Sequence, residues 1–298
     1  MKQGTLIETS YQEASDLQLR SDALNGNTKA LDQLIRNHYA FIYNVALKMV
    51  LDPNDAEDVT QEIVIKIITH LGKFQGRSSF RTWLYRIVVN HILTLKKMHC
   101  EYIVQDFDQY ARELNQMPDH DFPFQDSETP ESQQILEEIK LSCTAGMLMC
   151  LDREQRLVYT LGGIFEVDHN LGAEILDITP ANFRQKLSRA RKQLHSFMHN
   201  QCSLVNPSNP CKCAKKTKAF IDSGVVDPNH LVYRSHFTRR IEQILEKDHH
   251  KMEKELDTMT QSLYQNAPYQ ESEAFKKKLL DLIDSKRFQD TLDFGRES

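Results

Sequence analysis

Long apolar runs, cysteine, glycine and proline are all scarce in this chain of 298 residues. No stretch approaches the roughly 18 uninterrupted apolar residues of a membrane-spanning helix, so we expect no membrane segment. The beginning of the chain lacks a basic end followed by an apolar block, so we expect no secretory signal and a cytoplasmic location. Six cysteines do not suggest a disulfide scaffold at this length.

The scarcity of glycine and proline removes the usual breakers of helices, and β-branched alternation is equally rare. Apolar residues instead recur three and four positions apart, which predicts an all-α protein. We expect a helix over residues 31–46, a break at Asp52-Pro53-Asn54, a second helix after it and a third from Ser79 to Lys97. The expected organisation is two helical domains joined by an acidic linker, followed by a helical C-terminal extension. Its segments are 1–27, an N-terminal segment; 28–100, the first domain; 101–134, an extended acidic linker; 135–200, the second domain; and 201–298, a cysteine-containing joint with the extension.

Residues 73–97 stand out because the whole chain has a formal net charge of −5. This stretch contains aromatic side chains, including the only tryptophan, together with cations and no acid. On the expected third helix, an outward stripe suits stacking and phosphate contact with unpaired nucleotides; it consists of Trp83, Arg86, Asn90 and Lys97. The alternative interpretation is that Trp83 belongs to the core and the cations only solvate a face.

A second pattern, "NLGAEILDITPANFRQKLSRARKQL", is typical of a helix-turn-helix. Thr179 can cap the last helix and Pro180 suits its first position. That helix has five cations and no acid over residues 180–194, which fits the major groove of duplex DNA. A helix with a merely solvated basic face is the alternative.

The segments "DAEDVTQEIVIKII" and "GKFQGRSSFRTWLYRIVVNHILTLKK" resemble conserved region 2 of bacterial sigma factors, in particular the extracytoplasmic-function (ECF) group. The resemblance runs from about residue 30 to residue 97. It implies docking on the β′ clamp helices of core RNA polymerase through Asp58, Gln61 and Glu62, although acids at the start of that helix could also simply cap it. It also implies melting of the minus-ten promoter element, by a pocket for a flipped base and by contacts to the unwound strand from Phe74, Gly76, Ser78, Ser79, Trp83, Arg86, Asn90, Lys96 and Lys97.

The helix-turn-helix resembles sigma region 4, which reads the minus-thirty-five element and contacts the β flap. On this resemblance Arg184 and Gln185 read bases, while Lys186 and Arg189 contact phosphates. Leu171-Gly172 departs from the acid and aliphatic residue usual in relatives, which weakens the expected flap contact. The acidic linker is expected to thread the RNA channel of polymerase, with an ordinary disordered tether as the alternative.

The joint after the second domain gathers His195, His199, Cys202, Cys211 and Cys213. Thiolate and imidazole groups could hold a structural zinc ion, with Cys202, Cys211, Cys213 and His199 as its ligands. The spacing is not that of a standard zinc finger, and an unligated loop or a thiol redox switch are alternatives. Beyond the joint, apolar spacing predicts a long helix over 237–263 and a shorter one over 275–283, as a hairpin on the second domain or a regulatory element.

These features together predict a sigma factor with no catalysis of its own and no required cofactor. Its expected partners are core RNA polymerase and promoter DNA, double- and single-stranded. Whether an anti-sigma factor holds the chain inactive stays open. The alternatives are a stand-alone helix-turn-helix regulator and an enzyme, such as a zinc-dependent nuclease that uses the cysteine–histidine joint.

Overall fold

The computed structural model describes residues 11–96, 100–103, 106–121 and 129–231. These residues form helices, and the only β feature among them is an isolated bridge between Cys202 and Cys211. The expected all-α class is therefore confirmed. In the described part of the chain, no helix is both long and apolar enough to cross a membrane. The described residues divide into two compact units, one containing residues 11–96 and 165–183, the other residues 100–103, 106–121, 129–164 and 184–231.

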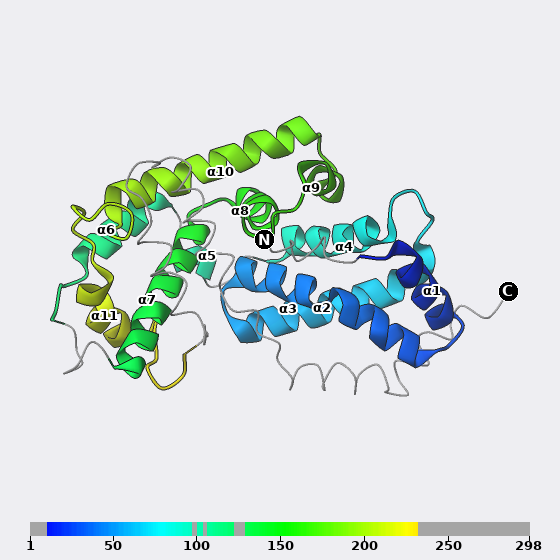
Figure 1. The fold of residues 1–298 in the computed structure, drawn as a ribbon, viewed down its shortest axis with the longest axis horizontal. Coiled ribbons are helices and arrows are strands. Elements are labelled where there is room, and N and C mark those ends of the chain that lie inside the picture. The colour runs from blue at the N-terminus through cyan, green and yellow to red at the C-terminus, as the bar shows by residue number, and fades with distance from the viewer. Residues whose placement is uncertain (1–10, 97–99, 104–105, 122–128, 232–298) are drawn as a thin grey trace. The chain divides into compact units, whose positions relative to one another are not determined.

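The first unit is a bundle in which α2, Thr28–Val50, packs against α1, Glu13–Leu24, and α3, Pro53–His70. A 3-10 turn, Leu71–Lys73, leads towards α4, Phe80–Thr94, which packs on the same bundle (Figure 1). The predicted break lies where Asp52 accepts hydrogen bonds from the N–H groups of Asn54 and Asp55, with Pro53 opening α3. The core is completely closed at Leu34, Ile42, Ile63, Phe80 and Leu84.

Helix α1 lies in the segment that the sequence left without an assigned structure. A buried pair holds it to α2, because His38 Nε2 lies 2.7 Å from Asp16 Oδ2 and both side chains are almost inaccessible. Asn37 adds a hydrogen bond of 3.1 Å to the other oxygen of Asp16. Burying a carboxylate is costly unless it is paired and hydrogen-bonded, so these contacts fix α1 on the bundle.

The second unit contains α5, Cys100–Ile103, α6, Phe107–Gln116, α7, Pro130–Met149, and α8, Arg153–Tyr159. A π-helical turn, Thr160–Ile164, follows α8. Most of α10, Pro180–Gln201, and all of α11, Cys213–Asp222, also belong here. Helix α7 packs against α6 and α11 (Figure 1).

The expectation of an extended linker over 101–134 is wrong for residues 107–116, which form α6. Asp106 caps this helix by accepting from the N–H of Gln109 at 2.7 Å. Tyr110 and Leu114, one turn apart, are buried, so the segment has a packing face despite its acids. The prolines that argued against helix lie outside α6.

Two boundaries also differ from prediction. Helix α7 begins at Pro130 rather than near Ile135, because proline at the first position of a helix starts it without a lost hydrogen bond. Helix α10 continues to Gln201, beyond the predicted basic segment. The helices expected over 237–263 and 275–283 lie outside the described residues.

Candidate nucleic-acid interface

The aromatic cluster of Phe74, Phe80 and Trp83 lies at the start of α4. The ring of Phe74 meets those of Phe80 and Trp83 at centroid distances of 5.3 and 5.5 Å, both edge-on. Phe80 is fully buried, whereas Phe74 and Trp83 are only partly buried. The indole ring is therefore not sealed in the core. The cluster exposes aromatic surface to solvent, while the buried Phe80 ring anchors it to the core.

Sequence reasoning missed two residues of α1 that hold this cluster in place. The guanidinium carbon of Arg20 lies 5.4 Å from the centre of the Phe74 ring, and Arg20 Nε donates to the carbonyl of Leu71 at 2.9 Å. Glu13 Oε1 accepts from the N–H of Phe80 at 2.5 Å. These contacts span more than fifty positions of sequence, so no local signal in the printed chain could have indicated them.

The loop before α4 contains the remaining residues of the predicted base pocket. Gly76 has a φ of +70°, a conformation that favours glycine, and a Cβ there would meet nothing within 4 Å. Ser79 caps α4, with its hydroxyl accepting from the N–H of Thr82 at 3.0 Å. The hydroxyl of Ser78 donates to the Ser79 carbonyl at 3.2 Å. The structure thus places Phe74 and both serines within one short loop.

The predicted outer stripe of α4 is only partly exposed. Asn90 and Lys96 are exposed, whereas Arg86 is half-buried and its Nε donates to the carbonyl oxygen of Glu174 at 2.8 Å. Glu174 belongs to α9, His169–Leu176, which packs on α4 within the first unit. Lys97 lies outside the described residues.

The predicted polymerase-binding residues lie on α3. Asp58 and Glu62 are exposed and Gln61 is half-buried. Glu62 Oε2 lies 3.1 Å from Nε2 of His91, while Lys66 Nζ lies 3.0 Å from Nδ1 of the same ring. Burial and the Lys66 charge lower the pKa of His91, which Glu62 partly opposes. These effects favour a neutral ring, whose Nδ1 can accept a hydrogen bond from Lys66.

The helix-turn-helix forms where it was predicted. The backbone at Asp177 is left-handed, with a φ of 55°, and ends α9. The predicted cap at Thr179 is confirmed, since its hydroxyl accepts from the N–H of Asn182 at 3.2 Å. Phe183 is fully buried, and a Cβ at Gly172 would lie 2.6 Å from its ring atoms. Gly172 is therefore required by the close approach of Phe183 to α9.

The predicted readers of duplex DNA follow on α10. Arg184, Gln185 and Arg189 are exposed. Lys186 is half-buried, with its Nζ 3.0 Å from Oε2 of Glu154. A partly exposed ion pair at the protein surface is worth only about 0–1 kcal/mol, so Lys186 can exchange Glu154 for a phosphate at little cost.

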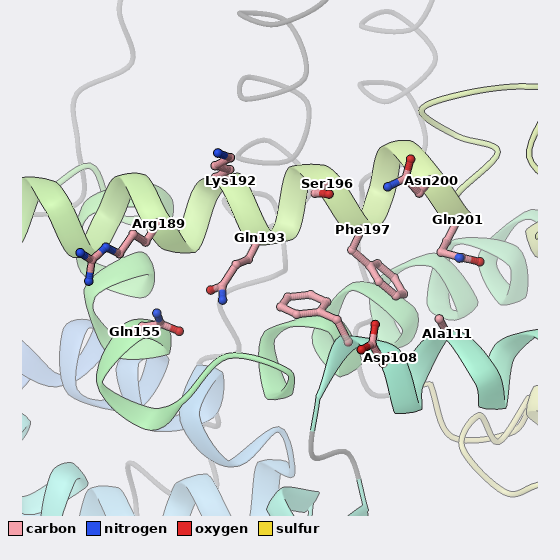
Figure 2. Close-up of a pocket in the computed structure, with 11 residues that line it drawn as sticks. Asp108, Ala111, Gln155, Arg189, Lys192, Gln193, Ser196, Phe197, Asn200 and Gln201 are labelled. Carbon is pink, nitrogen blue, oxygen red and sulfur yellow. The ribbon is translucent and has the colours of Figure 1, made fainter.

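A groove of about 500 Å³ extends along α10 in the second unit (Figure 2). Arg189 and Lys192 contribute to its lining, and Figure 2 shows Phe197 directed at the helix that carries Asp108 and Ala111. Phe107 and Phe197 also line the groove, and their ring centroids lie 5.3 Å apart. The basic face of α10 thus continues beyond the predicted base-reading residues.

The cysteine joint is compact, with Cys202 and Cys211 paired by the backbone bridge and both buried. The ring of His199 instead stacks on that of His195, with centroids 6.3 Å apart and planes nearly parallel. Within the described residues, no group of three or more His, Cys, Asp or Glu side chains could hold a metal ion, so the structure does not bring the predicted ligands Cys202, Cys211, Cys213 and His199 together as a zinc site.

Comparisons with known proteins agree with this geometry. Residues 34–99 match the family described as sigma-70 region 2; this range begins within α2 and contains all of α3 and α4. RNA polymerase sigma-H factor of Pseudomonas aeruginosa is 27% identical over 183 residues, which cover 60% of this chain and 91% of that protein. The ECF RNA polymerase sigma-E factor of Haemophilus influenzae is 25% identical over 191 residues, covering 62% and 96%.

A solved structure of CnrH in complex with the cytosolic domain of CnrY is also similar to this chain. The TM-score is 0.43 at 21% sequence identity, and the match covers 62% of this chain and 97% of that one.

Proposed function

Because the chain is a sigma factor of the extracytoplasmic-function group, we propose that it binds core RNA polymerase, directs it to promoters and promotes opening of the duplex. One observation carries the proposal. The aromatic cluster lies inside the region that matches sigma-70 region 2 and keeps part of its surface accessible to solvent. A stand-alone regulator that binds only paired DNA has no use for such a surface.

The aromatic cluster acts on unpaired bases in this proposal. A base that leaves the duplex can stack on an exposed ring, which stabilises the open strand by about 1–3 kcal/mol per base. Phe80 is buried and Arg20 braces Phe74, so the stacking surface is held before the base arrives. Asn90 and Lys96 then lie along the strand as amide and ammonium contacts.

The exposed end of α10 acts on paired DNA. Arg184 and Gln185 follow closely on the capped start of the helix, which is the part that reaches base edges when such a helix enters the major groove. Arg189 and Lys186 contact phosphates, which position the helix without reading sequence. Each surface therefore recognises a different state of the promoter.

The exposed acids of α3 supply the contact to polymerase in this proposal. Asp58 and Glu62 present negative charge, and Gln61 adds an amide between them. The chain itself catalyses no reaction, since polymerase performs the chemistry, and it works in the cytoplasm with that enzyme. No cofactor takes part in promoter recognition.

Run-off transcription with purified core polymerase and a promoter library tests the proposal. We expect promoter-specific transcripts only when the full chain is added. Gel shifts on the selected promoter then compare the free chain with the chain bound to core polymerase. Specific transcription that needs no added chain, or tight operator binding by the free chain as a dimer, contradicts the sigma function and supports the stand-alone regulator.

A further inference from the structure

Helix α1 packs on the start of α4 and on the 3-10 turn before it, within the first unit (Figure 1). It ends at Leu24, ahead of residues 34–99, which match sigma-70 region 2. The family match therefore assigns no role to this helix. Its side chains nevertheless contact the aromatic cluster, to which the proposed function gives the stacking of unpaired bases.

Arg20 of α1 holds the loop that carries Phe74. Its Nε donates to the carbonyl oxygen of Leu71 at 2.9 Å, and its Nη2 donates to that of Phe74 at 3.5 Å. Its guanidinium carbon lies 5.4 Å from the centre of the Phe74 ring. One planar group therefore fixes both the backbone and the ring of Phe74, which the point charge of a lysine does not reproduce.

Glu13 of α1 holds the first turn of α4. One carboxylate oxygen accepts from the N–H of Phe80 at 2.5 Å, and the other accepts from the hydroxyl of Tyr11 at 2.6 Å. Helix α4 has no acid in its own first turn, so Glu13 supplies from another helix the negative charge that the start of a helix favours. The guanidinium carbon of Arg81 lies 4.4 Å from the centre of the Tyr11 ring, which adds a second contact to the same turn.

The buried pair of Asp16 and His38 keeps α1 in place for these contacts. The His38 ring lies 6.4 Å from that of Phe80 and 5.6 Å from that of Tyr85, edge-on to both. The pair therefore links α1 and α2 to the buried member of the aromatic cluster. Because separation would leave buried polar groups without their hydrogen bonds, α1 is held at one position relative to the cluster.

We propose that Arg20 and Glu13 are positioning residues for promoter opening, which hold Phe74 and the start of α4 in the arrangement that receives an unpaired base. This inference rests on the proposed function, because positioning matters only if the cluster stacks bases. A ring that is already fixed loses little freedom when a base stacks on it, so more of the stacking free energy contributes to opening. The stacking surface thus depends on a helix outside residues 34–99.

A purely structural role for α1 makes different predictions. Arg20 and Glu13 are only half-buried, and the closed core at Leu34, Ile42 and Ile63 contains neither of them. Their removal should therefore leave the bundle folded and act on the aromatic cluster. If they only stabilised the bundle, every activity of the chain would fall together with the folded fraction.

Trp83, the only tryptophan of the chain, reports on the cluster in the full-length protein. Its ring centroid lies 5.5 Å from that of Phe74. In Arg20→Ala we expect its emission to shift to longer wavelength and its quenching by acrylamide to increase, because Phe74 is no longer held. Gln18→Ala is the matched control, since Gln18 is exposed on the same helix and its side chain donates to Asp22. Unchanged emission and quenching in Arg20→Ala overturn the proposal without any transcription assay.

Permanganate reactivity of a promoter bound by the chain and core polymerase tests the effect on opening. Arg20→Ala and Glu13→Ala should each lower the equilibrium constant for opening at least about threefold, with no change in binding to core polymerase. Glu13→Gln should recover most of the loss, because its amide oxygen can still accept from the N–H of Phe80. Arg20→Lys should recover only part. Normal opening by Arg20→Ala, or an equal loss in Gln18→Ala, overturns the proposal.

A second background separates positioning from a general loss of stability. Because Arg20 acts through Phe74, Arg20→Ala should cause little further loss of opening when Phe74→Leu is already present, whereas independent losses would add in full and overturn the proposal. Failure of the wild-type chain to direct specific transcription contradicts the proposed function, and the positioning role with it. A wild-type chain that opens promoters, with Arg20 and Glu13 variants that open them equally well, contradicts this inference alone.

Discussion

Removal of the Trp83 indole distinguishes the proposed role of the aromatic cluster in base stacking from its contribution to stability. The indole contacts Phe74 and Phe80, both at centroid distances of 5.5 Å. Aromatic pairs of this kind are worth about 0.5–1.5 kcal/mol each, so Trp83→Ala should lower the free energy of unfolding by about 1–3 kcal/mol. The first unit has a large closed core apart from this cluster, and we expect the variant to fold.

Trp83→Ala should also reduce promoter opening by a free energy of similar size, which a separate assay measures. One stacked base contributes about 1–3 kcal/mol, which corresponds to about a 5- to 150-fold lower equilibrium constant for the open complex. Trp83→Phe keeps an aromatic face and should recover most of this loss. Association with core polymerase should not change, because Asp58, Gln61 and Glu62 lie on α3.

Permanganate reactivity of unpaired thymines in the promoter measures opening, and urea unfolding measures stability. Ile87→Ala is the control, since Ile87 is half-buried on the same helix but outside the aromatic cluster. Equal loss of opening in Ile87→Ala and Trp83→Ala at matched stability would refute the stacking role. Normal opening by folded Trp83→Ala would refute it as well.

Three further predictions follow from single positions. Burial lowers the pKa of Lys48 from 10.5 to about 8. Between these pH values the folded chain binds fewer protons than the unfolded chain, so its stability rises with pH through that window. Lys48→Met should remove this rise and increase the free energy of unfolding by about 3 kcal/mol at pH 7, as measured by urea unfolding at a series of pH values. Gly172→Ala should lower the free energy of unfolding by about 1–2 kcal/mol in the same assay, because the new Cβ overlaps the buried Phe183 ring. This overpacking outweighs the gain in helix propensity of up to about 1 kcal/mol. An increase in stability would contradict this packing. Arg184→Ala should leave stability unchanged within about 0.5 kcal/mol but weaken use of the minus-thirty-five element by about 1–3 kcal/mol, seen as loss of discrimination between matched and altered elements in run-off transcription.

The helices that the sequence predicted well are those that local patterns determine. Regular apolar spacing, the cap at Asp52 and proline at the first helical position all lie within a few residues of the features they specify. Helix α6 was not predicted, because its acids and the neighbouring prolines dominate the local sequence pattern. Burial of Tyr110 and Leu114, which depends on α7 and α10, decides its structure instead.

In the candidate site, too, local sequence predicts some features and only the fold reveals the others. The residue types of the aromatic cluster could be read from adjacent positions, as could the cap of α10 at Thr179. The brace from Arg20 and the approach of Phe183 to Gly172 arise only when segments distant in sequence or on separate helices pack together.

The energies of the two proposed nucleic-acid surfaces give a reason to expect that recognition needs a larger assembly. Stacking on the aromatic cluster yields a few kcal/mol at most, and that gain must exceed the cost of unpairing the promoter. A few base and phosphate contacts from α10 are similarly modest, and the chain has a net charge of −5 that opposes long-range attraction to DNA. When both surfaces are fixed to one polymerase, the second contact becomes intramolecular and its effective concentration rises without any new interaction. We therefore expect the chain, in the proposed function, to gain specificity for promoters from attachment to polymerase and each surface alone to bind DNA weakly.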